Sequence, residues 1–328
     1  MHQRAPAKSL YQISASALGE MTIRILESAN EHLPTIARLL NDEYRGSYEF
    51  IPFDEERVVA QIRKRNFKIL VAEENGEISG LIGTRPEERS EEDIDWLAVR
   101  QGPDRRIIED LLVNEVEKNV KSDTVSTAID EGSSKIKDWT DRGYTLNPGW
   151  LRMSTQLTGP KQIPKVEEDI KLRSLGLEEE EELVILMNIG FGWERLERGV
   201  LEKWKSEDPS FREDWVQVAE TDERIVSAVV AKPDTDYNKY LHLKRGYLGP
   251  AATLPEFRNK HLASALTAQA MNLLLEKGMN SVRLGTSEQN LSSITLLRSI
   301  GFHVDIVRKI LRKKLKNAGA IGKLGRAP

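Results

Sequence analysis

The sequence predicts an α/β (α+β) chain of two tandem domains, each a mixed, mostly antiparallel sheet flanked by helices. Two observations support this fold class. The same order of strands and helices occurs twice, and 328 residues are long for one domain but comfortable for two. Between the copies, Thr158-Gly159-Pro160 and Ile163-Pro164 interrupt both helix and strand. We therefore expect domains at residues 21–157 and 165–316.

The first copy starts with a strand at Met21–Ile25, which makes residues 1–20 an expected loose arm. A helix follows, with apolar residues at helical spacing at Leu33, Ile36, Ala37 and Leu40. Phe67–Glu73 and Glu77–Thr84 then flank Asn75-Gly76, a strong signal for a two-residue hairpin turn.

The second copy repeats these elements in the same order. Ile170-Lys171-Leu172 predicts a strand, and the helix after it is indicated by Leu183, Leu186 and Met187. The hairpin recurs as Trp215–Glu220 and Ile225–Lys232. Asn41 and Asn188 close the matching helices, and Gly143-Tyr144 corresponds to Gly301-Phe302.

The segment Leu254–Leu266, LPEFRNKHLASAL, joins an apolar strand to an amphipathic helix through a short basic loop. The first turn of a helix has main-chain N–H groups without partners, and the peptide dipoles there favour negative charge. Phosphate oxygens are natural ligands at such a position. After the helix come a stop at Lys277-Gly278, a strand at Ser281–Thr286, and a helix opened by Asn290.

This order resembles the GNAT acyltransferase superfamily, whose members carry a strand, an R/Q-x-x-G-x-G/A pyrophosphate loop, a helix, a strand ending near an Asn, and a helix closing in Gly-Phe. The segment Arg258–Ala263 falls on the loop, Asn290 on the Asn, and Gly301-Phe302 on the closing pair. The resemblance implies that acetyl-CoA is the cofactor. The implied cofactor-binding residues are Leu254, through its main chain, with Arg258, Asn259, Lys260, His261, Leu262, Ala263, Asn290, Ser292 and Ser293.

Two positions depart from the family pattern. His261 stands where the first loop glycine usually lies, and a side chain there can crowd a phosphate that approaches the main chain. Leu297 stands four residues before Gly301, where many members carry a tyrosine that protonates the leaving thiolate. A leucine cannot donate that proton.

The matching loop of the first copy has lost these features. Pro103 replaces the Arg or Gln of the pattern, and Arg106 and Ile108 replace its glycines. Proline removes an N–H donor, and the bulky residues block close approach of a phosphate. We expect the first domain to be degenerate and to have a structural role.

Candidates for acid–base chemistry are Tyr247, on the strand before the loop, and Glu194, in the connection after the second copy's first helix. Positioning of the two substrates, with water carrying protons, is an alternative to either residue. No spacing of His, Asp or Glu suggests a metal site.

Composition excludes several classes of function. Cysteine is absent, which excludes disulfides and thiolate chemistry, and a net charge of -4 gives no reason to expect nucleic-acid binding. No apolar run is long enough to span a membrane, so we expect a cytoplasmic protein without membrane partners, either monomer or homodimer. The basic run at residues 308–316 is interpreted as solvated charge or as a partner for the cofactor's ribose phosphate, and residues 317–328 as a flexible tail.

Together these features predict an acyltransferase that moves an acetyl group from acetyl-CoA, held by the C-terminal domain, to an amine on a small molecule or peptide. The alternative is an acyl-CoA-binding sensor or scaffold that has lost turnover, as Leu297 and His261 suggest. One fold hosts many functions, so the resemblance alone does not choose between them.

Overall fold

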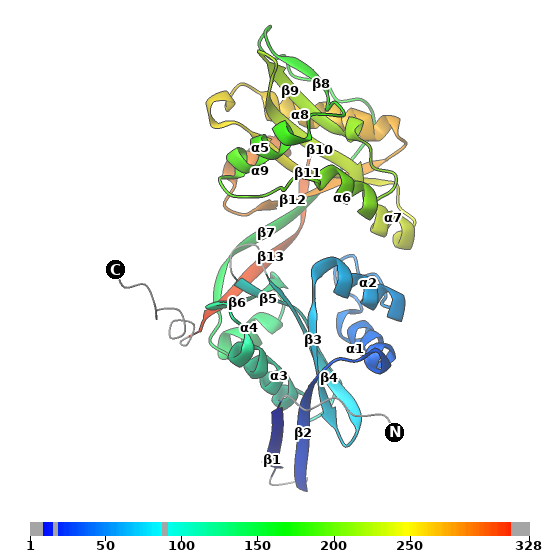
Figure 1. Cartoon of the computed structure of the whole chain (residues 1–328), viewed down its shortest axis with the longest axis vertical. Helices are drawn as coiled ribbons and strands as arrows, with labels where there is room; N and C mark the ends of the chain where they lie inside the picture. Colours follow the sequence, from blue (N-terminus) through cyan, green and yellow to red (C-terminus); the bar gives the residue numbers. More distant parts are fainter. Residues whose placement is uncertain (1–8, 16–18, 87–90, 316–328) are drawn as a thin grey trace, which may run out of the picture. The chain divides into compact units, whose positions relative to one another are not determined.

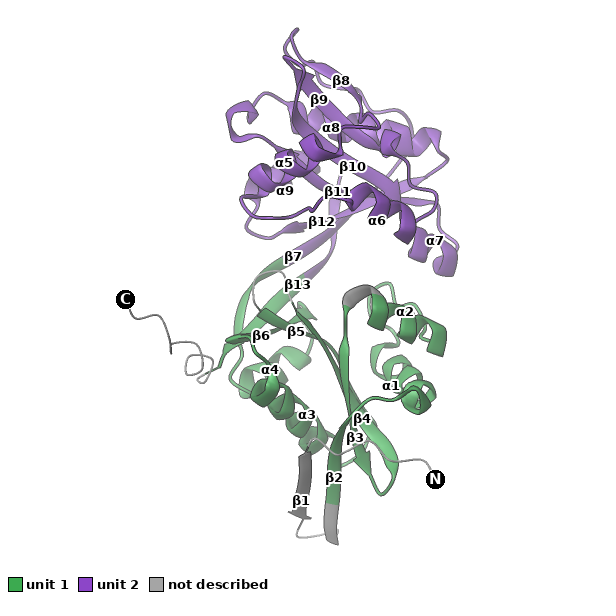
Figure 2. Cartoon of the chain, viewed as in Figure 1, with its two compact units in different colours: residues 1–149, 308–328 green, residues 150–307 purple. Residues whose placement is uncertain are grey.

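The structure, a computed structural model, describes residues 9–15, 19–86 and 91–315. Two compact units divide the chain: residues 1–149 with 308–328, and residues 150–307 (Figure 2). The expected tail at 317–328 lies outside the described residues, as does part of the expected arm. Within that arm, residues 9–15 form a strand. The domain limits 21–157 and 165–316 remain a prediction. The compact units have other limits, because the first includes residues 308–328 and the second begins at residue 150.

Together with residues 308–314 of the last strand, the first unit contains the strands and α-helices of the first half of the sequence. They are β1 (Ser9–Ala15), β2 (Gly19–Glu27), α1 (Leu33–Tyr44), α2 (Glu55–Arg65), β3 (Lys68–Glu74), β4 (Glu77–Pro86), β5 (Glu91–Val99), α3 (Arg105–Asn119), β6 (Thr124–Asp130), α4 (Lys135–Asp141) and the first residues of β7 (Thr145–Gln156).

The sheet of the first unit is antiparallel except at one pair of strands. Strands β1 to β5 pair in sequence order and antiparallel, whereas β5 and β6 are parallel. Helices α1 and α2 cover one face and α3 and α4 the other (Figure 1). Two apolar clusters fill the layers between them, one around Ile36 and Trp96 and the other around Leu112 and Trp139.

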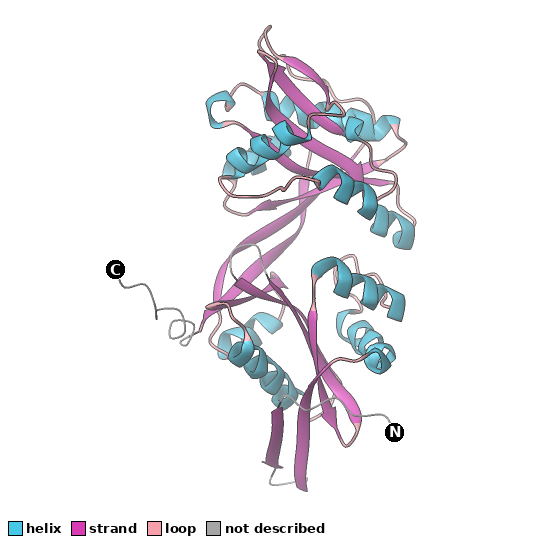
Figure 3. Cartoon of the chain, viewed as in Figure 1, coloured by secondary structure: helices cyan, strands magenta, loops and turns pink. Residues whose placement is uncertain are grey.

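The second unit repeats this arrangement. Its elements are the remainder of β7 with β8 (Lys171–Ser174), α5 (Glu180–Phe191), α6 (Val200–Glu207), β9 (Val216–Thr221), β10 (Arg224–Pro233), α7 (Thr235–Leu241), β11 (Arg245–Thr253), α8 (Leu262–Glu276), β12 (Ser281–Ser287), α9 (Leu291–Ser299) and the start of β13 (His303–Lys314) (Figure 3). Strands β8 to β11 pair antiparallel in sequence order, and β11 and β12 are parallel.

Each sheet receives a strand from the other half of the sequence. In the second unit, β12 pairs antiparallel with residues 150–156 of β7, which precede that half of the sequence. In the first unit, β6 pairs antiparallel with residues 308–314 of β13, which end the described chain. The two copies have therefore exchanged their last strands.

The exchange changes the interpretation of the basic run at residues 308–316. Four of its side chains are ion-paired strand residues: Arg308 binds Asp130 at 2.8 Å, Lys309 binds Glu131 at 3.2 Å, Arg312 binds Glu91 at 3.1 Å, and Lys313 binds Glu117 at 2.6 Å. The expectation of solvated charge was wrong for these residues. A basic run at a chain end is usually solvated, but here complementary carboxylates line the strand's new neighbours.

Local signals that repeat in the sequence have the same structural role in both units. The amide of Asn41 bonds both main-chain groups of Phe53, at 2.7 and 2.8 Å. The amide of Asn188 holds the chain after α5 in the same way, through Arg195 and Leu196. Each asparagine therefore ties the end of a helix to the loop that follows.

No helix in the described residues is long and apolar enough to cross a membrane.

We predict that Gly149→Ala destabilises the first unit. A Cβ at Gly149 would lie 1.8 Å from the carbonyl oxygen of Arg308, and a backbone atom cannot rotate away. The expected loss is about 2 kcal/mol or more in the free energy of unfolding, measured by urea denaturation. Gly159→Ala is the matched control, because a Cβ there meets nothing within 4 Å. Equal midpoints for the two variants would contradict the close contact.

Candidate functional site

Strands β11 and β12 separate partway along their length. Their parallel pairing ends at Leu248 and Leu284. Beyond that point β11 pairs with β10 again at residues 251–253, after an irregularity at residues 249–250, and β12 stays paired with β7 as far as Ser287. The facing edges of residues 249–253 and 285–287 are thus not bonded to each other. We call this gap in the ladder the opening.

Directly after β11 the chain forms the loop that the sequence predicted as a phosphate cradle. A short 3₁₀ turn at Pro255–Phe257 leads to Asn259 and His261, both with positive φ, and α8 begins at Leu262. Within the part of the chain that the structure describes, no main-chain N–H of residues 259–264 donates a hydrogen bond. These donors lie at the positive end of the α8 dipole, an arrangement that favours an anion, and we call residues 259–264 the cradle.

His261 adopts the left-handed conformation, with φ of 61°. Glycine reaches that region without steric cost, which is why a glycine is usual at such a position. The histidine side chain is exposed and borders an open hollow of about 500 Å³. The other residues of the hollow come from the start of α8 and from the whole length of α9: Ser264, Leu291, Ser292, Thr295, Leu296 and Ser299.

The two cations of the loop are bound within the protein. Arg258 donates to the carbonyl oxygens of Thr253, at 3.4 Å, and Gly190, at 3.1 Å. Lys260 pairs with Glu167 at 2.8 Å, and this contact raises the pKa of its ammonium group. Both side chains are at least partly exposed, so each remains accessible to an anion at the loop.

Leu254 and Asn290 already have structural partners. The N–H of Leu254 donates to Val226 and its carbonyl accepts from Phe257, while its side chain is buried. Asn290 caps α9, because its side-chain oxygen accepts from the N–H of Ser293 at 3.2 Å. The hydroxyl of Ser292 donates to the same oxygen at 3.1 Å. The main chain that borders the opening is instead that of residues 249–253, a segment that sequence analysis did not single out as a binding segment.

Tyr247 lies on the sheet face opposite α8. A Cβ on the preceding Gly246 would touch Leu274 of α8, and side chains alternate along a strand. The Tyr247 ring leans toward Gly249, whose Cβ position is 3.9 Å from the phenolic oxygen. Gly249 is the first residue of β11 beyond its pairing with β12. The hydroxyl of Tyr247 is thus brought to the edge of the opening.

The other catalytic candidate is not held in place in this way. Glu194 is exposed, and no hydrogen bond or ion pair joins it to another described residue. Its neighbour Arg195 packs against the rings of Phe191 and Trp193 instead. Leu297, which replaces the family's tyrosine, is buried in the core of the second unit and 4% exposed.

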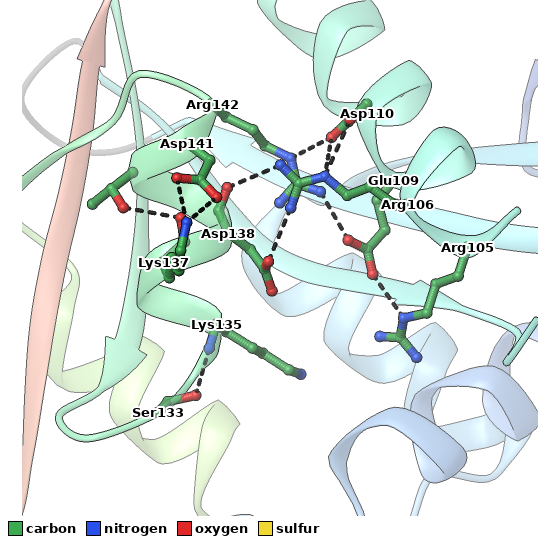
Figure 4. Close-up of polar contacts among 11 residues, drawn as sticks. Arg105, Arg106, Glu109, Asp110, Ser133, Lys135, Lys137, Asp138, Asp141 and Arg142 are labelled. Atoms are coloured by element: carbon green, nitrogen blue, oxygen red, sulfur yellow. Dashed lines mark hydrogen bonds and ion pairs between the residues drawn. The ribbon is translucent and has the colours of Figure 1, made fainter. Parts of the chain in front are cut away.

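The first unit has a similar gap between two parallel strands, but the helix that follows does not begin with a comparable cradle. Strands β5 and β6 pair only over residues 91–94 and 124–127, although β5 continues to Val99. At the start of α3 the charges are satisfied internally, as Figure 4 shows for Arg105 with Glu109 and for Arg106 with Asp110. Arg105 also binds Glu43, a carboxylate with only 4% of its side chain exposed, at 2.7 Å. Asp104 precedes the helix and adds negative charge there.

No group of three or more His, Asp or Glu side chains in the described residues is placed to hold a metal ion. The candidate site therefore consists of the opening, the cradle at residues 259–264, and Tyr247 on the opposite face of the sheet. It combines an anion site with an exposed strand edge and a hydroxyl, all in the second unit.

Comparison with known proteins assigns the fold. Residues 177–302 match the profile of the acetyltransferase (GNAT) family. A GCN5-related N-acetyltransferase from Sphaerobacter thermophilus is similar with a TM-score of 0.66 and 17% identity, over 89% of this chain and 96% of that one. A tandem GNAT protein from the clavulanic acid biosynthesis pathway is similar with a TM-score of 0.64 and 15% identity, over 91% and 99% of the two chains.

Comparison with curated proteins gave no match. The family profile covers the cradle, the opening and Tyr247, and the similar structures extend over both units. The second unit therefore contains a domain of the acetyltransferase (GNAT) family, and the chain as a whole has the fold of tandem GNAT proteins.

Proposed function

We propose that the protein is an acetyltransferase that moves the acetyl group of acetyl-CoA to an amine, with coenzyme A bound by the second unit. The observation that carries this proposal is the set of free N–H donors at residues 259–264, next to the opening between β11 and β12. The family supports acyl transfer in general. The donor, the acceptor and the place of binding are our proposal.

The residues present fit the cofactor's chemistry. The cradle offers several N–H donors to a diphosphate, and Ala263 is small enough to let it come close. Residues 249–253 present a free strand edge to the amide groups of the pantetheine arm, as an added strand would use it. Arg258 and Lys260 are placed to supplement the cradle from its rim. Ser292 borders the adjoining hollow.

Acetyl-CoA supplies the activated acetyl group, whose carbonyl carbon is attacked by the amine nitrogen while the carbon–sulfur bond breaks and the sulfur takes up a proton. Tyr247 provides that proton in our proposal, because its hydroxyl lies at the edge of the opening. Water returns the proton to the phenol and removes one from the amine. Glu194 is the weaker candidate, since no contact holds it near the sheet.

The first unit takes no cofactor in this proposal. Arginines at the start of α3 are bound by Glu43, Glu109, Asp110 and Asp138, so the charges that could attract a phosphate are already balanced. Its role in this proposal is structural. A cytoplasmic location and a monomeric or homodimeric state belong to the same proposal.

A second candidate function is an acyl-CoA-binding sensor without turnover. The buried Leu297 favours it, because that position holds no proton donor for the thiolate. Calorimetry with acetyl-CoA, followed by thiol-release assays against pooled amines and peptides, separates the two functions. Tight binding with no acetylated product would support the sensor, and absence of binding would contradict both.

We predict that Ala263→Glu weakens coenzyme A binding without harming the fold. A carboxylate in the first turn of α8 stabilises the helix by about 0.3–1 kcal/mol, but it repels a diphosphate bound at the same N–H groups. The expected loss of affinity is about tenfold or more, measured by calorimetry at low salt alongside thermal unfolding. Ala263→Gln is the control of equal size and should lose less. Wild-type affinity in both variants would place the diphosphate elsewhere.

We predict that Tyr247→Phe lowers kcat about 100-fold and leaves the affinity for acetyl-CoA unchanged. The variant keeps the ring and removes only the hydroxyl that supplies the proton. Steady-state kinetics and calorimetry measure the two effects separately. Tyr240→Phe, which removes a hydroxyl from α7, is the matched control. Full activity in Tyr247→Phe would rule out this tyrosine as the acid.

A further inference from the structure

Arg152 of β7 lies beside the opening on the same sheet face as Tyr247. Tyr247 pairs with Arg283 of β12, and the next residue of that face on β12 is Gly285. Gly285 in turn is paired with Arg152. Since Gly285 follows the last β11–β12 pair at Leu284, it borders the opening. Arg152 therefore lies one strand away from the opening.

The absence of a side chain at Gly285 leaves room for the guanidinium of Arg152. A Cβ on Gly285 would lie 2.8 Å from Nη1 of Arg152, so the arginine lies directly over the glycine. On the other side of the opening, the Tyr247 hydroxyl lies 3.9 Å from the Cβ position of Gly249. Two glycines thus border the opening, one beneath a phenol and the other beneath a guanidinium.

The side chain of Arg152 has no partner among the described residues, because no hydrogen bond or ion pair joins its guanidinium to any of them. The charged side chains nearby contact groups other than Arg152. Arg283 and Arg245 share Asp234, at 2.6 and 2.8 Å. Oδ1 of Asp305 accepts from Ser154 at 2.9 Å and lies 3.1 Å from His303, while its buried Oδ2 has no hydrogen-bond partner among the described residues. The half-buried guanidinium of Arg152 is therefore available to an anion that enters from outside the protein.

Trp150 lies next to Arg152 on the same face, two residues along β7. Its side chain is 49% exposed, unlike Leu151 and Met153, which are buried on the opposite face. A large exposed aromatic surface beside an unpaired guanidinium suits a molecule with an apolar body and a negative group. Both residues come from the first half of the sequence.

We propose that Arg152 binds a carboxylate of the acceptor, so that the acceptor is an amine that also carries a carboxylate, with Trp150 contacting its apolar part. This proposal rests on the proposed function, because it places the acceptor at the same opening. A planar guanidinium binds a carboxylate through two parallel hydrogen bonds, which also orients the acceptor. The amine is then directed toward the opening, across from Tyr247.

The test compares acceptors that differ only in the anionic group. The full-length protein is incubated with acetyl-CoA and pooled amines that include phenylalanine with phenethylamine, and β-alanine with propylamine and O-phosphoethanolamine. Thiol release and mass spectrometry identify the acetylated products. We expect products that carry a carboxylate. Products confined to amines without one, or to the phosphorylated amine, would overturn the proposal.

Arg152→Gln should raise the KM for the best carboxylated acceptor about 30-fold and leave acetyl-CoA affinity unchanged. Arg198→Gln, which removes an exposed arginine paired with Glu181, is the matched control. Gly285→Ala should have a smaller effect of the same kind, because its methyl group displaces the guanidinium. In the Arg152→Gln background, Gly285→Ala should raise this KM little further. That result would show that Gly285→Ala acts through Arg152. An equal loss for acceptors with and without a carboxylate would overturn the proposal.

A binding measurement separates this proposal from the proposed function. Saturation-transfer NMR records contact of phenylalanine and β-alanine with the protein in the presence of coenzyme A. If no amine is acetylated, the proposed function fails, while carboxylate binding that is lost in Arg152→Gln would still support the site. If neither carboxylated compound shows binding that depends on Arg152, the proposed carboxylate site is overturned, whether or not the protein acetylates an amine.

Discussion

Main-chain polar groups need partners, and two adjacent sets of them in the second unit have none among the residues that the structure describes. Strand β11 departs from β12 after Leu248, so residues 249–253 present an open edge. The N–H groups of residues 259–264 follow a few positions later at the start of α8. An extended molecule with amides at one end and a diphosphate at the other satisfies both sets at once. The arrangement of the site depends on this divergence of two strands.

The same constraint is resolved differently in the first unit. There the strands also diverge, but the start of α3 is surrounded by side chains that bind one another. Glu43 receives Arg105 and Lys135, and Glu109 receives Arg105 and Arg142. A nearly buried carboxylate held by two cations is costly to disturb, because removal of one partner leaves a charge without compensation. The two copies share a topology, but the helix start that is crowded with ion pairs in the first unit is open in the second.

Much of this was predictable from local sequence. Asn75-Gly76 marked a hairpin, and in the structure both residues have the positive φ that such a turn requires. The spacing of Leu262, Leu266 and Ala270 marked α8, and Asn290 was expected to open α9, which it caps. The fold class of two GNAT-like domains is confirmed. These features arise from contacts between residues close in sequence.

What could not be predicted depends on pairs that are far apart in the sequence. Arg312 binds Glu91 and Arg308 binds Asp130, and nothing near the basic run indicates these partners. Likewise, the alternation of Leu151 and Met153 is typical of a strand, but the pattern does not say that Gly285 lies opposite Arg152. Acid–base and acceptor residues were therefore the weakest part of the sequence interpretation, because register across strands decides which side chains meet.

The exchange of last strands has a consequence for biosynthesis. The first sheet lacks its final strand until residues 308–314 leave the ribosome, so β6 has an unprotected edge until then. A gene fragment that encodes only the second copy would likewise lack the tryptophan and arginine of β7 and expose an edge of β12. The two halves of the sequence therefore depend on each other, because each sheet is completed by a strand from the other half.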